Sequence, residues 1–418
     1  MEKQNLSMNK EKKDTQSKSL SKIAWQRLKK NNLSIFGLVL ISIAILVAVL
    51  GPNIRPDNSP KANDQTLELT TKKPGFSINI LKVKKNKPTE KTSWWKKFRE
   101  GTESQYQNIP IYDYSFEGQK IIIEKYTGGD VNNGQIIKFD LADVVYALKQ
   151  ANINDSNGNS EFYTFDEGKK IISIEELQKI VEKENIINKT YYLGTDKYGR
   201  DLLSRLMAGT WISLSVGFIS VFISLIIGIT MGAVGGYFRG WVDDIIIWVI
   251  NVVWSIPTLL LVIAITLALG KGHWQVFIAV GLTMWVEVAR VVRGQVLSLR
   301  EKEFVEAGRA LGFRNSRIIF HHIIPNVLGP VIVISAINFA AAILIEAGLS
   351  FIGIGAQPPQ ATWGKIIAEH KGYIITGNAY LAALPGFAIV LMVLAFILVG
   401  NGLRDALDSK TVDDLPTV

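Results

Sequence analysis

A charged run at residues 306–325 separates two apolar segments and offers the clearest chemistry in this sequence. Its residue types suit docking to another protein. Glu306 presents a carboxylate to a basic partner, whereas Ala307, Gly308 and Gly312 are small enough for a second surface to approach closely. The sequence therefore predicts a binding surface centred on Glu306.

Two short helices must position these residues. The stretch that begins at Glu303 and ends at Leu311 favours a helix, and Gly312 supplies the left-handed residue that often ends one. The Asn-Ser pair at residues 315–316 can cap a second helix, which we expect to end near Pro325. Such a hairpin can transmit force, because it cannot move without the two apolar segments that flank it. The alternative is an amphipathic interfacial loop whose arginines contact lipid headgroups.

No pattern in the sequence predicts catalysis, a cofactor or a metal. A phosphate-binding loop of the form GxxxxGK[ST] is absent, so we expect this chain not to bind ATP itself. Cysteine is also absent, which excludes disulfides and thiolate metal sites. The four histidines are too scattered in the sequence to indicate a zinc site; they are His273, His321, His322 and His370.

The composition indicates a membrane protein. Of the 418 residues, 48% are hydrophobic and 20% are charged, and the mean hydropathy is +0.20. A net charge of +9 is compatible with nucleic-acid binding, but the basic residues flank apolar runs, as they do beside membrane-spanning segments. We therefore expect membrane lipid, not nucleic acid, around this chain.

Apolar runs predict six membrane-spanning helices. The first run would cover about 27 Å at about 1.5 Å per residue, close to the thickness of the hydrocarbon layer. Basic residues precede this run and gather again between the fourth and fifth runs, which predicts that both flanks and both ends of the chain are cytoplasmic. The six runs are residues 33–50, 212–232, 245–269, 276–292, 327–350 and 384–399.

The long polar stretch between the first two runs predicts a domain outside the cell membrane. Residues 119–126 and 135–140 look like strands that pair as a hairpin, since glycine and asparagine residues lie between them. Residues 141–151 and 174–184 look helical, and a capping box at Ser173 introduces the second helix. A small α+β module is therefore expected.

The fold class that follows is an all-α polytopic membrane protein with six transmembrane helices and an extracytoplasmic α+β insert between helices 1 and 2. The expected boundaries divide the chain into five parts. These are a cytoplasmic N-terminal segment (1–32), the first transmembrane helix (33–51), the insert (52–190), a core with helices 2 to 6 (191–402) that contains the charged loop (301–325), and a cytoplasmic tail (403–418).

The charged run resembles the cytoplasmic EAA loop of bacterial ABC importer permeases. Glu306, Ala307 and Gly308, followed by Gly312 and Pro325, stand at the spacing of that motif, although Gly308 replaces its second alanine. The resemblance extends to the C-type permease subunit of oligopeptide and dipeptide importers, and it covers nearly all of the chain except the insert. The further matching blocks are residues 25–31, 193–205, 346–351, 357–359, 363–364 and 402–407.

The resemblance implies a type I ABC importer permease in the bacterial cell membrane, working in peptide transport. A homologous permease would complete the pathway, two cytoplasmic ATPases would bind ATP and Mg, and an extracytoplasmic peptide-binding protein would deliver substrate. We expect the insert to extend the surface on which that binding protein docks. The ATPase-coupling residues would be Glu303, Glu306, Ala307, Gly308, Leu311, Gly312 and Pro325.

Alternatives remain for the substrate and for the class of protein. Nickel permeases share most of the matching blocks, so nickel or a nickel chelate is the closest alternative substrate. An ATP-independent channel or a receptor built on the insert is the alternative from a different class.

Residues that are unusual inside membrane spans mark further candidate sites. Pro257 removes a backbone hydrogen bond within the third run and should bend it, either to shape the pathway or as a tolerated kink. Glu346, near the outer end of the fifth run, either faces the pathway or makes a structural hydrogen bond. Glu287, in the fourth run, stands at helical spacing from Arg290 and Arg293 and can pair with either.

Overall fold

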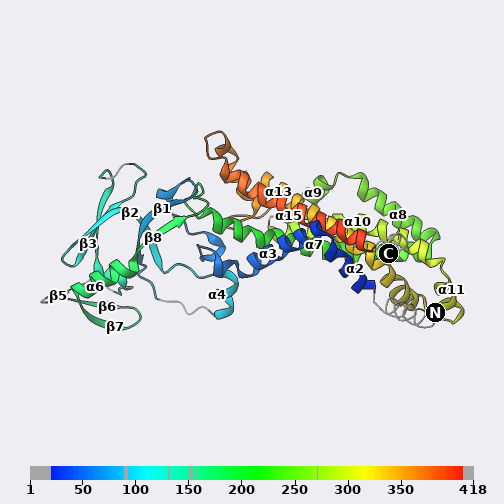
Figure 1. Cartoon of the computed structure of the whole chain (residues 1–418), viewed down its shortest axis with the longest axis horizontal. Helices are drawn as coiled ribbons and strands as arrows, with labels where there is room; N and C mark the ends of the chain where they lie inside the picture. The colour runs from blue at the N-terminus through cyan, green and yellow to red at the C-terminus, as the bar shows by residue number, and fades with distance from the viewer. Residues whose placement is uncertain are drawn as a thin grey trace, which may run out of the picture.

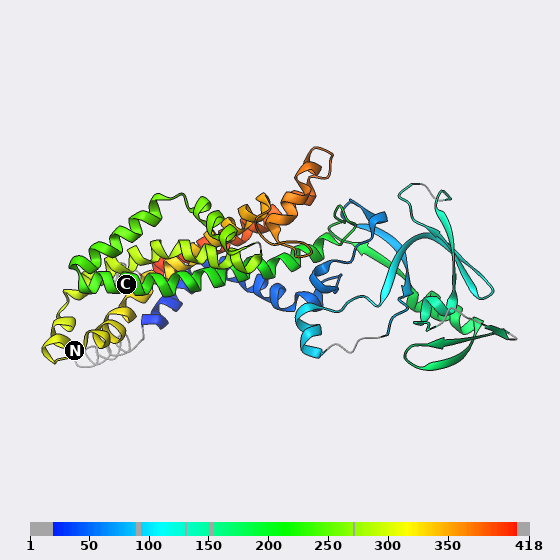
Figure 2. The same cartoon turned by 180° about the vertical axis from the view of Figure 1, so that it is seen from behind.

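The computed structural model describes residues 20–88, 93–129, 132–149, 154–156, 158–270 and 272–407. The described part is elongated, with a body of long helices at one end and a domain containing strands at the other (Figure 1). Figure 2 shows the same division from behind. The first described helix, α2 (Leu20–Lys30), and the end of the last, α15, pack together in the helical body, far from the strands.

Five helices among the described residues are long and apolar enough to cross a membrane without a break. Their presence confirms an all-α membrane body and five of the six expected spans. They are α3 (Asn32–Ile54), α7 (Leu202–Phe238), α10 (His273–Arg300), the continuous helix that ends as α13 (Asn315–Ile352) and α15 (Tyr380–Leu407).

The third expected span is broken in the middle. Its two halves, α8 (Gly240–Ser255) and α9 (Thr258–Leu269), meet at an angle of 92°. Ile256 is extended because the ring of the following proline disfavours the α conformation, and Pro257 has no N–H to donate to α8. The bend expected at Pro257 is confirmed, but it is sharp enough to end one helix and begin another. The pair makes a sixth span only if α8 and α9 cross the membrane together.

Close packing of α7 against α10 forms the centre of the helical body. A Cβ atom added to Gly228 would lie 2.5 Å from Cβ of Val288, and one added to Gly232 would lie 2.6 Å from the carbonyl oxygen of Ala289. Real Cβ atoms do not approach that closely, so these glycines allow the two backbones to touch. Between α13 and α15 the chain forms α14 (Trp363–His370) and η5 (Lys371–Ile374).

The insert contains two antiparallel sheets, which confirms that a strand-containing domain lies between the first two spans. The larger sheet has five strands in the order β4-β3-β2-β1-β8, and the smaller has three in the order β5-β6-β7. The strands are β1 (Phe76–Lys84), β2 (Tyr106–Glu117), β3 (Lys120–Lys125), β4 (Gln135–Asp140), β5 (Asn154–Ser156), β6 (Asn159–Thr164), β7 (Gly168–Ser173) and β8 (Ile186–Tyr191).

The expected hairpin and one expected helix of the insert are confirmed. Strands β3 and β4 pair with Ile121 opposite Phe139. The hydroxyl of Ser173 accepts a hydrogen bond from the N–H of Glu176 at 3.3 Å, as the capping box predicts. The remaining short helices are η1 (Pro60–Ala62), η2 (Leu67–Leu69), α4 (Trp94–Glu100), α5 (Leu141–Val145), α6 (Ile174–Ile180) and the π-helical turn η3 (Val181–Asn185).

The helix expected at residues 141–151 is wrong beyond Val145. There α5 ends, and Leu148 instead forms a β-bridge with Thr164. The N–H of Leu148 donates to Oδ1 of Asn86 at 2.6 Å. Pairing with distant parts of the insert therefore overrides the local preference for helix.

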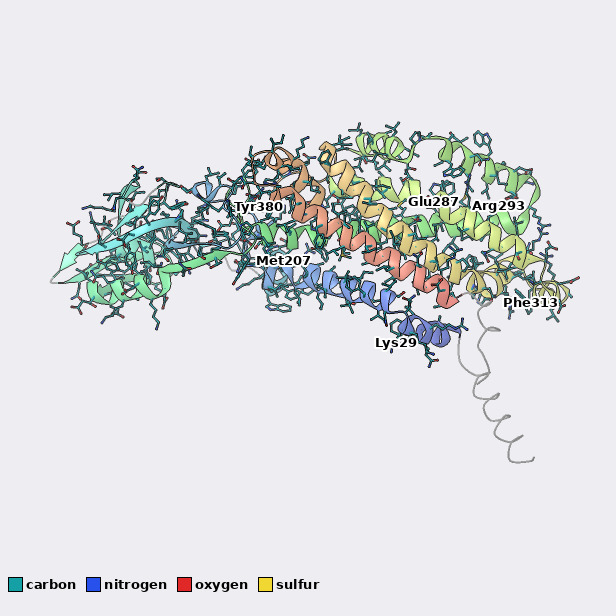
Figure 3. All side chains as sticks on the ribbon, turned by 45° about the horizontal axis from the view of Figure 1, so that its top comes forward. Lys29, Met207, Glu287, Arg293, Phe313 and Tyr380 are labelled. Carbon is teal, nitrogen blue, oxygen red and sulfur yellow. The ribbon has the colours of Figure 1, made fainter. Side chains whose placement is uncertain are left out.

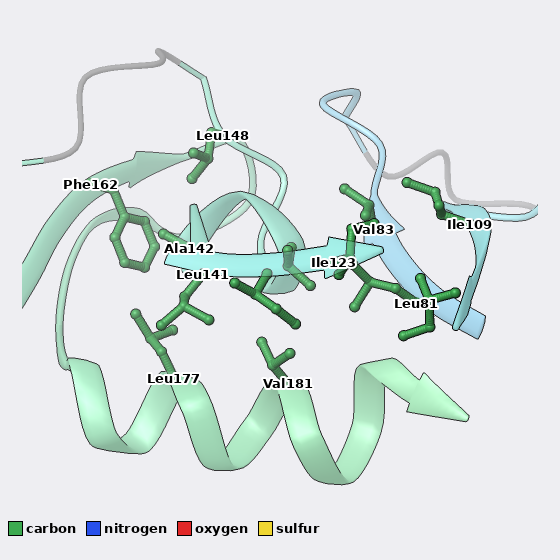
Figure 4. Packing of buried hydrophobic residues seen from close by; sticks show 13 residues of the cluster. Leu81, Val83, Ile109, Ile123, Leu141, Ala142, Leu148, Phe162, Leu177 and Val181 are labelled. Atoms are coloured by element: carbon green, nitrogen blue, oxygen red, sulfur yellow. The ribbon is translucent and has the colours of Figure 1, made fainter. Parts of the chain in front are cut away.

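The insert has its own apolar core (Figure 4). Leu177 of α6 and Val181 of η3 face the sheet and pack with Leu81 and Ile123, while Phe162 connects the smaller sheet to the same cluster. All five side chains are buried. Burial of each contributes roughly 2 kcal/mol to the stability of the domain.

A buried polar junction joins the insert to the helical body. Nε of Arg200 donates to Asp196 at 2.6 Å, and its Nη2 donates to Glu369 of α14 at 3.3 Å. Nη1 of Arg205, in the first turn of α7, donates to the carbonyl oxygen of Pro359 at 2.8 Å. Since both guanidinium groups are buried and hydrogen-bonded, they hold α7 and α14 to the base of the insert.

The chain enters and leaves the larger sheet at neighbouring points. Phe76, at the start of β1, lies opposite Tyr191, at the end of β8. The N–H of Gly75 donates to the carbonyl oxygen of Tyr191 at 2.9 Å. Gly199 follows shortly afterwards with φ of +69°, and a Cβ atom there would lie 1.7 Å from the carbonyl oxygen of Thr66, so only glycine fits.

Candidate functional site

Helix α11 (Glu303–Ala310) ends in the left-handed turn that the sequence predicts. Gly312 has φ of +73°, its N–H donates to the carbonyl oxygen of Arg309 at 2.9 Å, and the N–H of Phe313 donates to that of Gly308 at 3.0 Å. This pair of bonds is a Schellman motif, which satisfies carbonyl groups at the helix end. Gly312 thus fixes the reversal of the chain after α11.

The two faces of α11 have opposite environments. Glu303, Glu306 and Ala307 lie on the exposed face, and Leu311 beyond the helix end is 72% exposed. Val305, on the other face, is fully buried. The spacing of three and four residues between the exposed positions places them along one stripe. An acidic and apolar stripe is therefore available for contact, while the opposite face is fixed to the helical body.

The inner face of α11 is part of a core shared by several long helices. Val305 packs in one cluster with Val296 of α10, Ile323 and Val327. Gly308 is buried in the same region, where an added Cβ would lie 3.5 Å from Phe313, an ordinary contact distance. The buried Gly308 therefore contacts other residues of the loop. The exposed side of the loop carries Glu306, Ala307 and Gly312.

The second half of the charged loop differs from its prediction. Arg314 occupies the cap position and makes no side-chain cap bond, so neither residue 315 nor 316 caps the helix. The chain then continues through α12 (Asn315–Arg317) and the π-helical turn η4 (Ile318–Ile323) into α13 (Ile324–Ile352). The expectation that Pro325 ends this helix is wrong. Pro325 lies in the first turn of α13, where the wider π-helical turn before it accommodates the missing N–H.

Tyr237, near the end of α7, connects the parts of this site and was not identified from the sequence. Its hydroxyl donates to Oδ1 of Asn315 at 2.9 Å. The guanidinium groups of Arg300 and Arg309 lie 5.8 and 5.4 Å from the centre of its ring. The ring is only 4% exposed, so Tyr237 links α7 to α10, α11 and α12 at once. A tyrosine at the end of an apolar run was the one available signal.

Two ion pairs hold α8 beside this site. Arg293 of α10 makes a bidentate contact with Asp243 of α8, with both N···O distances at 2.6 Å. At the loop itself, Arg239 and Glu301 form an exposed pair at 2.8 Å. The bidentate pair is partly buried, so it stabilises the packing of α8 on α10 more strongly than the exposed pair stabilises the loop.

The stripe on α11 lies at the end of the molecule opposite the insert. Figure 1 shows α11 beyond the ends of α7 and α10, and Figure 3 labels Phe313 there and Tyr380 toward the insert. α7, α10, α13 and α15 run between the two ends. The distance between these sites means that any coupling between them must pass along the helices.

The two residues expected near a pathway have different environments. Pro257 is exposed at the break between α8 and α9. Glu346 is 2% exposed, and the hydroxyl of Ser350, one turn later in α13, donates to its Oε1 at 2.6 Å. Its neighbour Ala347 packs against Trp363 of α14. The structure thus encloses Glu346 within the helical body and leaves Pro257 on its surface.

No group of three or more histidine, aspartate or glutamate side chains suited to a metal occurs among the residues that the structure describes. His321 and His322 lie in η4, where His322 stacks on Phe313 at 5.9 Å between ring centres. His370 is buried in α14. His322 and His370 therefore take part in packing.

Comparison with known proteins gives two family matches. Residues 210–413 match the model described as the inner membrane component of binding-protein-dependent transport systems. Residues 19–74 match the N-terminal transmembrane domain of oligopeptide transport permease C.

Bacterial permease proteins of three transport systems are similar to about half of the chain. The dipeptide transport system permease protein DppC of Alkalihalophilus pseudofirmus is 43% identical over 220 residues, 53% of this chain and 72% of that protein. The glutathione transport system permease protein GsiD of Pectobacterium atrosepticum is 39% identical over 223 residues, 53% of this chain and 74% of that protein. The oligopeptide transport system permease protein OppC of Bacillus subtilis is 37% identical over 223 residues, 53% of this chain and 73% of that protein.

Proposed function

The chain belongs to the family of inner membrane components of binding-protein-dependent transport systems, and we propose that it is the C-type permease subunit of an ATP-driven importer of peptides. The relatives are named for the transport of dipeptides, oligopeptides and glutathione, which are all short peptides. The chain would form the pathway together with a homologous permease and receive its substrate from an external binding protein. ATP would be hydrolysed by partner subunits.

The observation that carries the coupling role is the two-faced structure of α11. Glu303, Glu306 and Leu311 are exposed for contact with an ATPase, whereas Val305 is fixed in a core shared with α10 and α13. A movement imposed on α11 would therefore move those helices and, through Tyr237, α7. Packed helices change between discrete arrangements, so such a movement can switch the pathway between inward-facing and outward-facing states.

The orientation proposed for the membrane follows from charge. Basic residues gather at the α11 end, including Arg309, Arg314 and Arg317, and basic residues beside spans favour the cytoplasmic side. With α11 and both ends of the chain in the cytoplasm, the insert lies outside the membrane. In this arrangement the ATPases would bind at the α11 end of the molecule and the binding protein at the opposite end, near the insert.

The coupling role is tested by Glu306→Lys in the complete importer. Reversing this exposed charge should reduce ATP-driven peptide uptake at least about tenfold, because loss of a charged docking contact costs on the order of 1.4 kcal/mol or more. Co-purification of the ATPases should weaken in parallel. Glu103→Lys reverses an exposed charge in the insert and should leave uptake unchanged. Normal ATP-driven uptake by Glu306→Lys would contradict the coupling role, and normal uptake that does not depend on ATP would favour a channel or receptor instead.

The substrate is tested by comparing uptake of a radiolabelled dipeptide with uptake of radioactive nickel. Cells that carry the gene should accumulate the dipeptide, and cells that lack it should not. Nickel accumulation should not depend on the gene. Accumulation of nickel without peptide would replace the peptide assignment with the nickel alternative.

A further inference from the structure

Glu287 is a charged residue halfway along a membrane-spanning helix. It is the fifteenth of the 28 residues of α10, which places it about 20 Å from either end of the helix. Figure 3 labels it between the ends marked by Phe313 and Tyr380. Its side chain is exposed on the surface of the chain. Within the apolar run at residues 276–292, Glu287 lies five residues from the α11 end, and an ionised group there cannot remain in lipid at low cost, so it must face water or protein.

The partners that the sequence predicts for Glu287 are engaged elsewhere. Arg293 pairs with Asp243, as described above. Arg290 donates to Oδ1 of Asn251 at 3.2 Å, and its guanidinium lies 3.5 Å from the centre of the Trp254 ring. Glu287 takes part in no ion pair or hydrogen bond with any residue that the structure describes. The prediction that it pairs with Arg290 or Arg293 is therefore wrong, and the carboxylate is available to a ligand.

A cavity lies beside this carboxylate. Its volume is about 210 Å³, and two of the side chains that line it, Thr258 and Thr283, carry hydroxyl groups. The cavity lies beside the break at which α8 and α9 meet at 92°, because Trp254 of α8 and Thr258 of α9 both line it. Broken backbone at membrane depth is tolerated where it is buried in protein or lines a water-filled cavity. The helix break and the free carboxylate thus independently indicate an aqueous or protein-lined space at the same place.

The face of α10 that carries Glu287 is polar toward α11. At about 100° per residue, the exposed Ser298 lies close to Glu287 around the helix, whereas the exposed apolar residues toward the insert, Trp274, Ile278 and Leu282, lie on the opposite side. On the face of Glu287, Val280 toward the insert is buried. This arrangement suits a water-filled passage that is open at the α11 end and ends at Glu287.

We propose that Glu287 is the residue of the translocation pathway that recognises the ammonium group of the peptide substrate. This inference rests on the proposed function. The carboxylate and the adjacent hydroxyl groups accept hydrogen bonds, and the cavity is large enough for the terminal group of a peptide but not for the whole of it. A cationic side chain of the homologous permease is the competing occupant, which the experiment distinguishes.

The test measures binding of two fluorescent peptides to the complete importer in lipid nanodiscs without its binding protein. The peptides carry the dye at the C-terminus and differ only in a free or acetylated N-terminus. The wild type should bind the free form at least about tenfold more tightly, as expected when a charge-assisted hydrogen bond is lost. Glu287→Gln should bind both forms alike, and Glu287→Asp should recover part of the preference. Asp244→Asn, which removes an exposed carboxylate near the other end of α8, should keep the full preference.

Three outcomes would overturn the inference while peptide uptake by the wild type persists. The first is an unchanged preference in Glu287→Gln, and the second is no preference in the wild type. The third is loss of the homologous permease from purified Glu287→Gln, with uptake of all peptides reduced equally, which would assign Glu287 to the contact between permeases. If the wild type takes up no peptide at all, the proposed function itself fails.

Discussion

Tyr237 shows how a single residue can connect elements that are far apart in sequence. Its hydroxyl bonds Asn315, and its ring lies beside Arg300 and Arg309, so one side chain of α7 contacts three other helices. Sequence reasoning found the exposed Glu306 because it stands with Ala307 and Gly312 at the spacing of a known motif. It could not find Tyr237, since a tyrosine at the end of an apolar run has the same local pattern whether or not it bonds a distant loop.

Removing the hydroxyl of Tyr237 should weaken coupling more than folding. Tyr237→Phe keeps the buried ring and loses one hydrogen bond, which costs about 1 kcal/mol of stability. We expect fewer peptides transported per ATP hydrolysed in proteoliposomes. Tyr380→Phe removes a similar bond, to the carbonyl oxygen of Lys72 at 2.7 Å, near the insert and should leave that ratio unchanged. An equal ratio in the two variants would remove Tyr237 from the coupling path.

At the scale of elements, α14 is held by a histidine that must be neutral. Nδ1 of His370 bonds the carbonyl oxygen of Ile366 at 2.7 Å, and Nε2 accepts the N–H of Lys197 at 3.3 Å. The ring can satisfy both only with its proton on Nδ1. Burial lowers the pKa of His370 below its ordinary value of 6.5, although Asp196 and Glu369 nearby oppose the shift. The neutral ring is thus part of the junction between α14 and the insert.

Acid should therefore destabilise this junction. Because the pKa of His370 is lower in the folded protein than in the unfolded one, its contribution to stability is fully present above about pH 6.5 and is lost as the pH falls through the folded value. The thermal unfolding midpoint of the purified wild type should fall between pH 7.5 and pH 5.5. His370→Gln should show a smaller fall over the same range. Parallel pH profiles for the two proteins would contradict this assignment.

The elements also show where local sequence patterns succeed and fail. The Gly312 turn and the cap at Ser173 depend on neighbouring residues, and both formed as expected. The helix end expected at Pro325 did not form, because a π-helical turn leads the chain into α13 there. The helix expected beyond Val145 did not form either, because Leu148 makes a β-bridge with Thr164. Strands β1, β2 and β8 were missed altogether, since their pairing joins segments far apart in the chain.

At the scale of the whole molecule, the insert and α11 occupy opposite ends of the same helices (Figure 1). The spans and the insert were predictable because apolar runs and long polar stretches report burial directly. The cavity beside Glu287 was not predictable, since it lies at the 92° bend between α8 and α9. The unpaired carboxylate of Glu287 was not predictable either, because Asp243 and Asn251 bind the nearby arginines.

Deleting the strands should separate folding of the helical body from docking of the binding protein. Replacing residues 77–190 with a short Gly-Ser linker keeps the buried contacts of Arg200 and Arg205, so the helical body should still assemble with its partners. Affinity for the binding protein, measured by surface plasmon resonance on the complete importer, should fall at least about tenfold if the insert supplies roughly 1.4 kcal/mol or more of that contact. Unchanged affinity and uptake would show that docking does not use the insert.

The pairing of Phe76 with Tyr191 has a consequence for how such a chain can change over generations. The two points of attachment are already neighbours, so a permease without the domain needs little more than a tight turn at this place. A gene could therefore acquire or discard the whole domain in one step without moving any membrane helix, and the entropy of closing the remaining loop would change by only about 1 to 3 kcal/mol. The domain outside the membrane can therefore change between generations without a change in the helices that cross the membrane.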